Sequence, residues 1–355
     1  MVEWKKLGEV CEIKTGRGIT QKDCSEDGQY PVISGGQTPM GMYHQYNRES
    51  KTVTISRVGA YAGYVSFINE RFYLNDKCFS IIPFDNSVLN NKYLYSVLKG
   101  QEEIIQKLQS EGGVPTINTK KVGALSIPIP SLSEQQRIVS ILDTFTSSIS
   151  NLKQQIEERR KQYEYERDLL LDLEGKEGVE MKKLGEVLQI KKGDYITKKE
   201  AKEGVYPVIL GGKEPAYYID RYNHVGKAIV ISRSGASAGY VSFWNQPIFI
   251  TDGFLIEPKE NVLFEFLYYT LKSKQRELHG SQKGGAIPHV TPASISTIKS
   301  FFPPLSTQSR IVSILDTFEQ SISNLEEQLA MREKQYEYYR NQLLTFEGEE
   351  ERGKT

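Results

Sequence analysis

Cysteine, tryptophan and histidine are scarce in this sequence of 355 residues, which contains three, two and four of them respectively. Cys11, Cys24 and Cys78 are too widely spaced for a C-x-x-C metal pair or a disulfide framework, so we expect reduced, buried thiols. No stretch approaches the roughly 18 uninterrupted apolar residues of a membrane span. The first residues lack the basic-then-apolar layout of a signal peptide, so the chain is expected to stay in the cytoplasm.

Recognisable catalytic motifs are also lacking. The sequence has no Walker loop, no glycine-rich dinucleotide fingerprint after a strand, and no Asn-Pro-Pro-aromatic or Asp-Pro-Pro-aromatic string of an amino-methyltransferase. The histidines show no metal-ligand spacing, and Asp76 and Asp252 lack the paired acid and lysine cluster of a nuclease. We therefore expect a chain that is not an enzyme, and a standalone enzyme is the least favoured reading.

Net charge is absent too, because 45 Lys and Arg residues balance 45 Asp and Glu residues. The whole-chain sum hides an uneven distribution. Residues 1–132 carry a net charge of +2 and residues 180–306 one of +5, whereas residues 133–173 carry −2 and residues 307–355 carry −4. Basic globular parts joined by acidic connecting parts can bind a polyanion in selected places.

The sequence contains an internal repeat of nearly its whole length. Equivalent residues of the two copies are 176 or 177 positions apart early in the repeat and 173 positions apart later. The repeated strings are YPVISGG at 30–36 with YPVILGG at 206–212, ISRVGAYAGYVSF at 55–67 with ISRSGASAGYVSF at 231–243, and RIVSILDTF at 137–145 and 310–318. Each half is therefore one structural unit of about 175 residues.

Each unit begins with strands and turns. Short segments rich in β-branched and aromatic residues alternate with Gly and Pro. The segments expected as strands include Thr52–Arg57, Tyr64–Phe67, Phe79–Ile82, Ile229–Ser232 and Tyr240–Phe243. One helix is expected over Asn91–Leu108 and one over Leu263–Leu278, before the last strand of each lobe. Each lobe is therefore predicted to be mixed α/β.

Each unit ends with a long helix. Pro130 prevents an earlier start of the first one, and Ser133 with Gln136 forms a capping-box pattern. Apolar positions then recur every 3.5 residues over four heptads, beginning with Ile138 in the first copy and Ile311 in the second. This period is typical of a left-handed coiled coil.

Two kinds of side chain on this seam are not aliphatic. The tyrosines Tyr163, Tyr336 and Tyr339 are predicted to pack in the seam. Arg159 and Arg332 are polar seam positions, which we expect to fix the register, or to meet a lobe or a partner, rather than to bind DNA.

The two long helices are expected to pair within the chain and to run antiparallel. About a dozen residues separate the first helix from the second lobe, so that lobe begins near the C-terminal end of the first helix. Homodimerisation through the same helices is the alternative. At about 1.5 Å per residue, the seam from Ile138 to Leu170 spans roughly 48 Å.

The predicted fold class is α+β, with two mixed α/β lobes held apart by an intramolecular antiparallel coiled coil of two long helices. The predicted parts are lobe 1 at 1–132, helix 1 at 133–174, a linker with lobe 2 at 175–306, helix 2 at 307–346 and a C-terminal tail at 347–355.

The stretch GGVPTINTKKVGALSIPIPSLSEQQRIVSIL at 112–142, with the earlier KLGEV and the doubling, resembles the DNA-specificity subunit of type I restriction-modification systems. The resemblance covers nearly the whole chain. The family's Pro-rich strand end, Glu-Gln pair and apolar helix are matched by Pro128, Pro130, Glu134, Gln135 and Ile138. The second copy departs from it with Thr307 in place of Glu and keeps Gln308 and Ile311.

The resemblance implies two target-recognition domains separated by the two helices, and no catalysis by this chain. It implies duplex DNA, two modification (methyltransferase) subunits and restriction (translocase/nuclease) subunits as partners, and no membrane. S-adenosylmethionine, ATP and Mg²⁺ would then belong to the partner subunits, with no cofactor in this chain.

The residues themselves favour the same function. Two basic lobes on a stiff spacer suit a long, periodic polyanion, and roughly 48 Å corresponds to about 14 base pairs of duplex DNA. Because the lobes differ while the helices agree, each lobe is expected to read a different half of a bipartite, asymmetric target. The alternative is a two-lobed coiled-coil scaffold that joins proteins or glycans instead of DNA.

The loops that follow YPVI are candidate DNA contacts. They are Ser34, Gly35, Gly36 and Gln37 in the first copy and Gly211, Gly212 and Lys213 in the second. Paired glycines allow a close backbone approach to a phosphate or a base edge, but they suit a tight turn equally well.

Charged residues at the ends of strands and on loops are the second group of candidates. Arg57 and Arg233 follow apolar strands in both copies, which favours a phosphate contact over a base contact, with an intradomain salt bridge as the alternative. The further candidates are Arg17, Lys120, Lys121, Lys191 and Lys192, together with Tyr61 and Ser237, which occupy the same place in the two copies. For these residues a solvated surface is the alternative.

Overall fold

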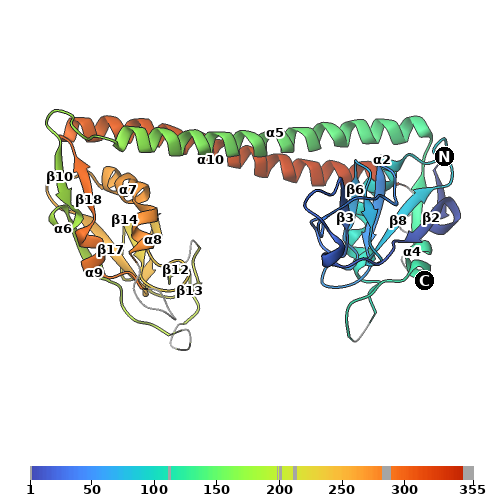
Figure 1. The fold of residues 1–355 in the computed structure, drawn as a ribbon, viewed down its shortest axis with the longest axis horizontal. Coiled ribbons are helices and arrows are strands. Elements are labelled where there is room, and N and C mark those ends of the chain that lie inside the picture. The colour runs from blue at the N-terminus through green and yellow to red at the C-terminus, as the bar shows by residue number, and fades with distance from the viewer. Residues whose placement is uncertain are drawn as a thin grey trace. The chain divides into compact units, whose positions relative to one another are not determined.

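The computed structural model describes residues 2–110, 113–197, 199, 202–210, 214–281 and 289–346. The chain divides into two compact units: unit 1 comprises residues 1–153 and 327–355, and unit 2 comprises residues 154–326. Each unit contains one lobe of strands and short helices, and half of each long helix (Figure 1). The C-terminal tail predicted at 347–355 lies outside the described residues. Within the described ranges, no helix combines the length and the apolar character that crossing a membrane requires.

A four-stranded antiparallel sheet forms the centre of unit 1. Its strand order is β2 (Cys11–Thr15), β8 (Cys78–Pro83), β5 (Thr52–Ser56) and β6 (Val65–Ile68). All five residues of β5 are buried, and helix α2 (Asn91–Gly100) packs against β5 and β6. The remaining elements of the lobe are β1 (Glu3–Lys6), α1 (Leu7–Val10), a 3₁₀ turn at Gln21–Asp23, β3 (Tyr30–Ile33), β4 (Met42–Tyr43), β7 (Tyr73–Leu74), α3 (Glu102–Gln106), α4 (Thr119–Gly123) and β9 (Ser126–Ile129).

Unit 2 repeats this topology. Its four-stranded sheet has the order β11 (Leu188–Lys192), β17 (Gly253–Pro258), β14 (Lys227–Ser232) and β15 (Val241–Asn245). The remaining elements are β10 (Glu180–Lys183), α6 (Leu184–Val187), β12 (Tyr206–Ile209), β13 (Tyr217–Ile219), β16 (Phe249–Ile250), α7 (Phe264–Ser273), α8 (Gln275–Gly280), α9 (Pro292–Thr297) and β18 (Lys299–Phe302). Both units are mixed α/β, as the doubled sequence predicts.

The helix expected before the last strand is interrupted in both units. In unit 1 it breaks at Gln101 between α2 and α3, and in unit 2 at Lys274 between α7 and α8. The breaks place a side chain against the first strand residue of β6 or β15: Glu102 Oε2 accepts from the Val65 N–H at 2.8 Å, and Gln275 Oε1 accepts from the Val241 N–H at 3.0 Å. In both units the side chain that follows the break is therefore hydrogen-bonded to an edge strand of the sheet.

The repeated GYVSF motif contains a glycine that the turn before β6 requires. Gly63 has a φ of +98°, and a Cβ atom there would lie 2.8 Å from the side chain of Gln106. Gly239 in unit 2 has a φ of +84° and faces the backbone of Leu278 at 2.9 Å. Both the positive φ and the close approach exclude a larger residue, so the identity of this motif in the two copies is structural.

Helices α5 (Leu132–Leu171) and α10 (Leu305–Leu344) pack against each other within the chain. In unit 1, Phe145 stacks on Tyr339 with 5.3 Å between ring centroids, and the ammonium of Lys153 lies 2.9 Å from the carboxylate of Glu333. Residue numbers rise along α5 while those of its contacts on α10 fall, so the helices are antiparallel. Figure 1 shows them as the green and red helices. The intramolecular pairing predicted from the heptads is confirmed, and homodimerisation is not needed to cover the seam.

The same pairing continues in unit 2 with the arginines and tyrosines of the seam. Arg159 lies over the ring of Phe318 at 5.9 Å, and Arg332 occupies the same relation to Phe145 at 5.6 Å in unit 1. Tyr163 packs beside Phe318 at 6.5 Å. These side chains are packing and register residues of the coiled coil, as the heptad pattern predicts.

The long helix begins earlier than its predicted cap. Helix α5 starts at Leu132, and the hydroxyl of Ser131 accepts a hydrogen bond from the Glu134 N–H at 3.4 Å. The predicted capping box of Ser133 and Gln136 is therefore wrong by two residues, because both lie inside the first helical turns. Thr307 in the second copy does not disturb the start of α10 at Leu305.

Two buried glutamines attach the long helices to the lobes. Gln135 is 0% exposed; its amide donates to the carbonyls of Val88 at 2.8 Å and Pro130 at 2.9 Å, and its Oε1 accepts from the Asn90 N–H at 2.8 Å. In unit 2, Gln308 is 1% exposed and makes the three equivalent bonds, at 3.0, 2.8 and 2.9 Å, with Asn261, Pro303 and Leu263. Each glutamine therefore orients a long helix relative to its own lobe.

The thiols do not all share one environment. Cys11 and Cys78 are buried free thiols, and burial raises the pKa of each to about 12. Cys24 is only partly buried, so the expectation of three buried thiols is wrong for this residue.

A partly buried carboxylate lies where α10 meets the lobe of unit 2. Burial raises the pKa of Glu319 above its ordinary value, and the nearby Asp316 adds to the rise, although hydrogen bonds from the hydroxyls of Tyr163 and Tyr269 and the charge of Lys272 oppose it. The Tyr163 hydroxyl donates to Glu319 at 3.1 Å. At the corresponding places in unit 1, Thr146 and Ser96 bond only to carbonyls of their own helices.

We expect Glu319→Gln to stabilise unit 2 at neutral pH. A raised pKa means that the folded state disfavours the carboxylate, so ionised Glu319 lowers stability above its folded-state pKa and ceases to do so below about pH 4.5. Gln retains an acceptor for Tyr163 without the charge. Thermal unfolding should show a rise of about 2 °C at pH 8 that vanishes near pH 4. A gain of equal size at both pH values, or the same gain from Glu164→Gln on the exposed surface of α5, would contradict this account.

Candidate nucleic-acid interface

Loops from distant parts of the sequence gather at one end of the four-stranded sheet of unit 1. The Arg17 N–H donates to the Leu74 carbonyl at 2.9 Å, the Arg57 N–H to Lys77 at 2.7 Å, and the Ile117 N–H to Arg57 at 2.9 Å. We call this cluster, residues 16–18, 34–37, 57–61, 74–78 and 114–117, the loop end of unit 1. The loop end is opposite the end of the sheet at which β2 starts and β8 ends. Gln135 lies toward that opposite end, where it binds Asn90.

Arg57 is central to this loop end. Its guanidinium donates to the Asp76 carbonyl at 3.1 Å and lies over the ring of Phe79 at 5.8 Å. Among the described residues it has no carboxylate within 4 Å. The guanidinium is thus oriented by neutral partners and its charge is not neutralised by a salt bridge, which suits binding of a phosphate or a guanine edge.

The glycine pair after β3 has two different environments. A Cβ atom on Gly35 would lie 2.7 Å from the Val58 carbonyl, so Gly35 is required by packing between two loops. Gly36 is exposed and has room around it, and Gln37 beside it is exposed too. Ser34 is partly buried, and its carbonyl accepts a hydrogen bond from the Cys78 thiol at 3.0 Å. Gly36 and Gln37 are therefore the most exposed residues of this loop.

The other candidates of unit 1 are at or near the loop end. Arg17 is exposed on the loop after β2, and the ring of Tyr61 is 47% exposed. Lys120 and Lys121 lie on α4, directly after the loop-end segment 114–117. Both are exposed, but the ammonium of Lys121 donates to the Leu108 carbonyl at 3.0 Å.

Unit 2 has an equivalent cluster. The Gly193 N–H donates to the Gly253 carbonyl at 3.1 Å, the Arg233 N–H to Asp252 at 3.1 Å, and the Val290 N–H to Arg233 at 2.9 Å. We call residues 192–194, 233–237, 250–253 and 289–290 the loop end of unit 2. Ser237 lies in it, partly exposed, in the turn that corresponds to Tyr61. Gly211, Gly212 and Lys213 lie outside the described residues.

The charge of Arg233 is partly compensated, unlike that of Arg57. Its guanidinium lies 3.5 Å from the Asp252 carboxylate, which also accepts a hydrogen bond from the Ser234 hydroxyl. The salt bridge considered as the alternative for this pair of arginines is thus present in unit 2. The arginine side chain is still 41% exposed, so its outer face is open to a further anion.

A pocket of about 400 Å³ opens beside Arg233. Its walls contain the cations Lys192 and Arg233 and the imidazole of His289. The Nδ1 atom of His289 is buried and has no hydrogen-bond partner within the described part of the chain. The other lining residues are Ile190, Phe254, Val290, Thr291 and Pro292. The cation of Lys192, the partly compensated cation of Arg233 and the unpaired Nδ1 atom of His289 in one concavity suit the binding of an anion.

Adjacent lysines on β11 have different roles. Successive side chains of a strand point to opposite faces, so Lys191 and Lys192 diverge. The ammonium of Lys191 lies 2.5 Å from the Glu257 carboxylate, whereas Lys192 lines the pocket. Of this predicted pair, only Lys192 is brought to the loop end.

His289 is a lining residue that the sequence does not mark as part of a site, because its spacing from the other histidines is not that of metal ligands. Its position became visible only through the bridge that pairs it with Ser234, as Thr116 pairs with Val58 in unit 1. An alignment of the two copies would place His289 opposite Thr116 and is the one signal that could have identified it. In the described ranges, no three His, Cys, Asp or Glu side chains are grouped as metal ligands.

Comparison with known proteins gives one consistent result. A family model described as the type I restriction modification DNA specificity domain matches residues 1–159 and 176–331. The chain is 27% identical over 359 residues to a provisionally named type I specificity subunit of Mycoplasma pneumoniae, covering 96% of each protein. It is 26% identical to the specificity subunit of an Escherichia coli type I restriction enzyme, covering 97% of this chain and 94% of that protein.

Solved structures show the same fold. The crystal structure of the S subunit of a type I restriction-modification system from M. genitalium matches with a TM-score of 0.68 and 21% identity, covering 98% of this chain and 96% of that one. A chain from a structural study of complex assembly and conformational transition in the type I system matches with a TM-score of 0.59 and 18% identity, covering 97% of both chains.

Proposed function

This chain belongs to the type I restriction-modification DNA-specificity family, and we propose that it binds duplex DNA as the specificity subunit of a type I restriction-modification complex. Each loop end reads one half of a bipartite, asymmetric target. The relatives are named for specificity and not for catalysis, in agreement with the expectation of a non-catalytic chain.

One observation supports the proposal above the others: the two loop ends share a framework but differ in the side chains they present. Arg57 and Arg233 follow the same strand in both units, which suits a common contact to the DNA backbone. At matching places, Thr116 is replaced by His289 and Tyr61 by Ser237. Shared phosphate contacts position a duplex, and divergent side chains specify different bases.

We further propose that α5 and α10 set the number of unread base pairs between the two half-sites. Both helices are continuous over 40 residues, and each begins on one unit and ends on the other. Such a rod couples the two readers mechanically. The sequence-based estimate is a separation of about 14 base pairs between lobe centres.

The chemistry belongs to partners in this proposal. Two modification (methyltransferase) subunits would use S-adenosylmethionine to methylate adenines, and restriction (translocase/nuclease) subunits would use ATP and Mg²⁺. Two equivalent partners suit a chain with an internal twofold repeat. Lys153 is paired with Glu333 across the helices, so a charge reversal at Lys153 would disturb the coiled coil as well as any surface that docks a partner.

Replacing Lys192 by Ala should weaken binding of the target duplex about 5- to 10-fold and reduce the slope of log K against log salt by about one. Lys192 is available in the pocket of unit 2, and its ammonium would neutralise one phosphate. Titration of the full chain with its modification subunits, at several salt concentrations, measures both quantities.

Lys191→Ala is the matched control. It removes the same charge from the neighbouring residue, but the charge of Lys191 is already paired with Glu257. Its effect should stay below about 2-fold. Equal losses from the two variants would reject the pocket as the phosphate site. Binding without any salt dependence would reject the DNA reader and favour a protein or glycan scaffold.

A further inference from the structure

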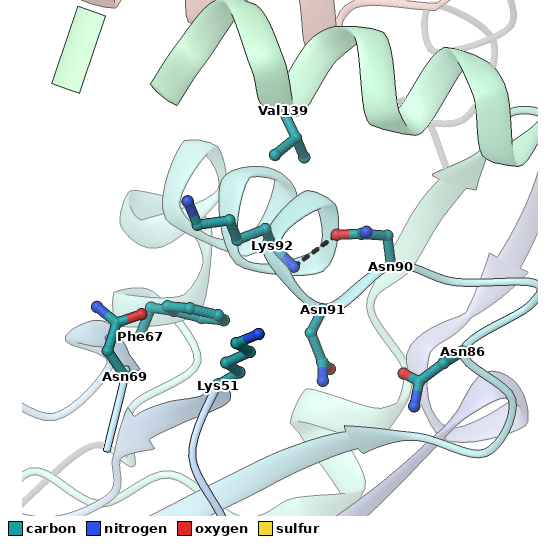
Figure 2. A pocket seen from close by; sticks show the side chains of 8 residues that line it. All are labelled: Lys51, Phe67, Asn69, Asn86, Asn90, Asn91, Lys92 and Val139. Atoms are coloured by element: carbon teal, nitrogen blue, oxygen red, sulfur yellow. Dashed lines mark hydrogen bonds between the residues drawn. The ribbon is translucent and has the colours of Figure 1, made fainter. Parts of the chain in front are cut away.

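A pocket is also present in unit 1. It lies at the end of the four-stranded sheet that is opposite the loop end of this unit (Figure 2). It lies between the start of α2, the end of β6 and the long helix α5. Its volume is about 450 Å³, within the range of small-molecule sites. The lining residues are Lys51, Phe67, Asn69, Asn86, Asn90, Asn91, Lys92 and Val139.

The lining combines an aromatic ring, carboxamide groups and a positive charge. Phe67 supplies an aromatic ring, which is fixed by packing against Tyr95 at 5.5 Å between centroids. Four asparagines supply carboxamides, of which Asn90 is engaged as the N-cap of α2. Figure 2 shows Asn91 between Lys51 and Asn86, with Val139 pointing from α5 toward the start of α2.

The positive charge of the pocket comes from Lys51. The ammonium of Lys92 lies 2.5 Å from the Asp143 carboxylate, so its charge is already compensated. Lys51 has no carboxylate within 4 Å in the described part of the chain. It also adopts a φ of 58°, a conformation that residues other than Gly, Asn and Asp rarely take.

Asn91 contributes an unsatisfied acceptor. Its Oδ1 atom is buried and has no hydrogen-bond partner in the described residues. A buried carbonyl oxygen without a donor is unfavourable, so a ligand that brings an N–H or amino group would gain a hydrogen bond here.

Unit 2 has different side chains at the corresponding positions. Phe264 and Glu265 of unit 2 stand where unit 1 has Asn91 and Lys92, and Lys227 stands where it has Lys51. The Lys227 ammonium lies 2.5 Å from Glu265, and the Phe264 ring packs edge-on against Phe243 at 6.0 Å. The chain's own side chains therefore occupy in unit 2 the positions that line an open pocket in unit 1.

We propose that the pocket of unit 1 binds a mononucleotide. The ring of Phe67 stacks against the base, the Oδ1 atom of Asn91 accepts from an amino or ring N–H group of the base, and Lys51 binds the phosphate. The site lies at the opposite end of the unit 1 sheet from the loop end of that unit, so we expect nucleotide binding to be independent of DNA reading.

Isothermal titration of the full chain with AMP, CMP, GMP and UMP tests the proposal. At least one nucleotide should bind with a Kd of roughly 0.1 mM, whereas adenosine and inorganic phosphate, each bearing half of the ligand's chemistry, should bind at least about 10-fold more weakly. Absence of binding by every nucleotide at millimolar concentration, or equally tight binding of inorganic phosphate alone, would overturn the proposal.

Two variants locate the binding. Asn91→Phe with Lys92→Glu introduces the pair that unit 2 already accommodates, and should abolish nucleotide binding. Lys51→Asn removes the charge and introduces a residue that tolerates the positive φ, so nucleotide binding should weaken about 10-fold. Lys107→Asn, at the exposed end of α3, is the control and should leave nucleotide binding unchanged. Unchanged nucleotide binding by either pocket variant would refute the site. Duplex binding, measured on the same samples, should be unaffected and reports on the DNA reader separately.

Discussion

Inserting one heptad into α5 and one into α10 should widen the unread gap of the methylated sequence by about three base pairs. Seven residues lengthen a helix by roughly 10.5 Å, and duplex DNA rises about 3.4 Å per base pair. The insertions belong after Ile156 in α5 and after Leu329 in α10. Each point lies between two residues that are ion-paired to the other helix, because Lys153 pairs with Glu333 and Arg160 pairs with Glu326. A whole heptad keeps the seam in phase.

Mapping of methylated adenines in cells that co-express the chain with its cognate modification subunit measures this change. Both half-sites should be unchanged in sequence, while methylation at the original spacing should fall at least about 100-fold, because one loop end can no longer reach its bases. Insertion into α5 alone is the control and should lose specific methylation, since the two seams no longer match. If the double insertion leaves the gap unchanged, the helices do not set the spacing.

Replacing Gln135 or Gln308 by Leu should destabilise the unit concerned by about 3–5 kcal/mol. Each glutamine satisfies two carbonyls and one N–H at a buried junction, and Leu leaves all three backbone groups without partners. Because the residue fits the same space, the loss measures hydrogen bonding and not a cavity.

Urea unfolding of the full chain measures this effect, and the affected transition should differ between the two variants because the glutamines belong to different units. Gln136→Leu is the matched control, on an exposed position next to Gln135 in the same helix, and should change stability by less than about 0.5 kcal/mol. A loss below about 1 kcal/mol from both buried variants would show that the junction is held by apolar packing alone.

Much of the architecture could be predicted because its signals are local or repeated. The 3.5-residue period identified the coiled coil, and the identical RIVSILDTF strings placed it in both halves. The cap was misplaced from Ser131 to Ser133 because both serines precede an acceptable helical start, and a side-chain hydrogen bond decides between them. The split at Gln101 was missed because the residue after it, Glu102, is hydrogen-bonded to the Val65 N–H on a strand that is distant in the sequence.

The candidate site was less predictable. Lys191 and Lys192 are neighbours of the same type in the sequence, yet one is neutralised by Glu257 and the other is available in a pocket. Arg57 and Arg233 occupy the same motif, but only Arg233 meets a carboxylate. Gly35 looked like a ligand-facing glycine and instead faces the Val58 carbonyl.

The sequence by itself determined that the protein consists of two similar lobes and two long paired helices, since repetition and heptad periodicity are properties of the order of residues. Only the tertiary structure decided which side chains are available to a ligand. Availability depends on whether a carboxylate, a carbonyl or a ring from elsewhere in the chain has already satisfied the group, and those partners are tens of residues away.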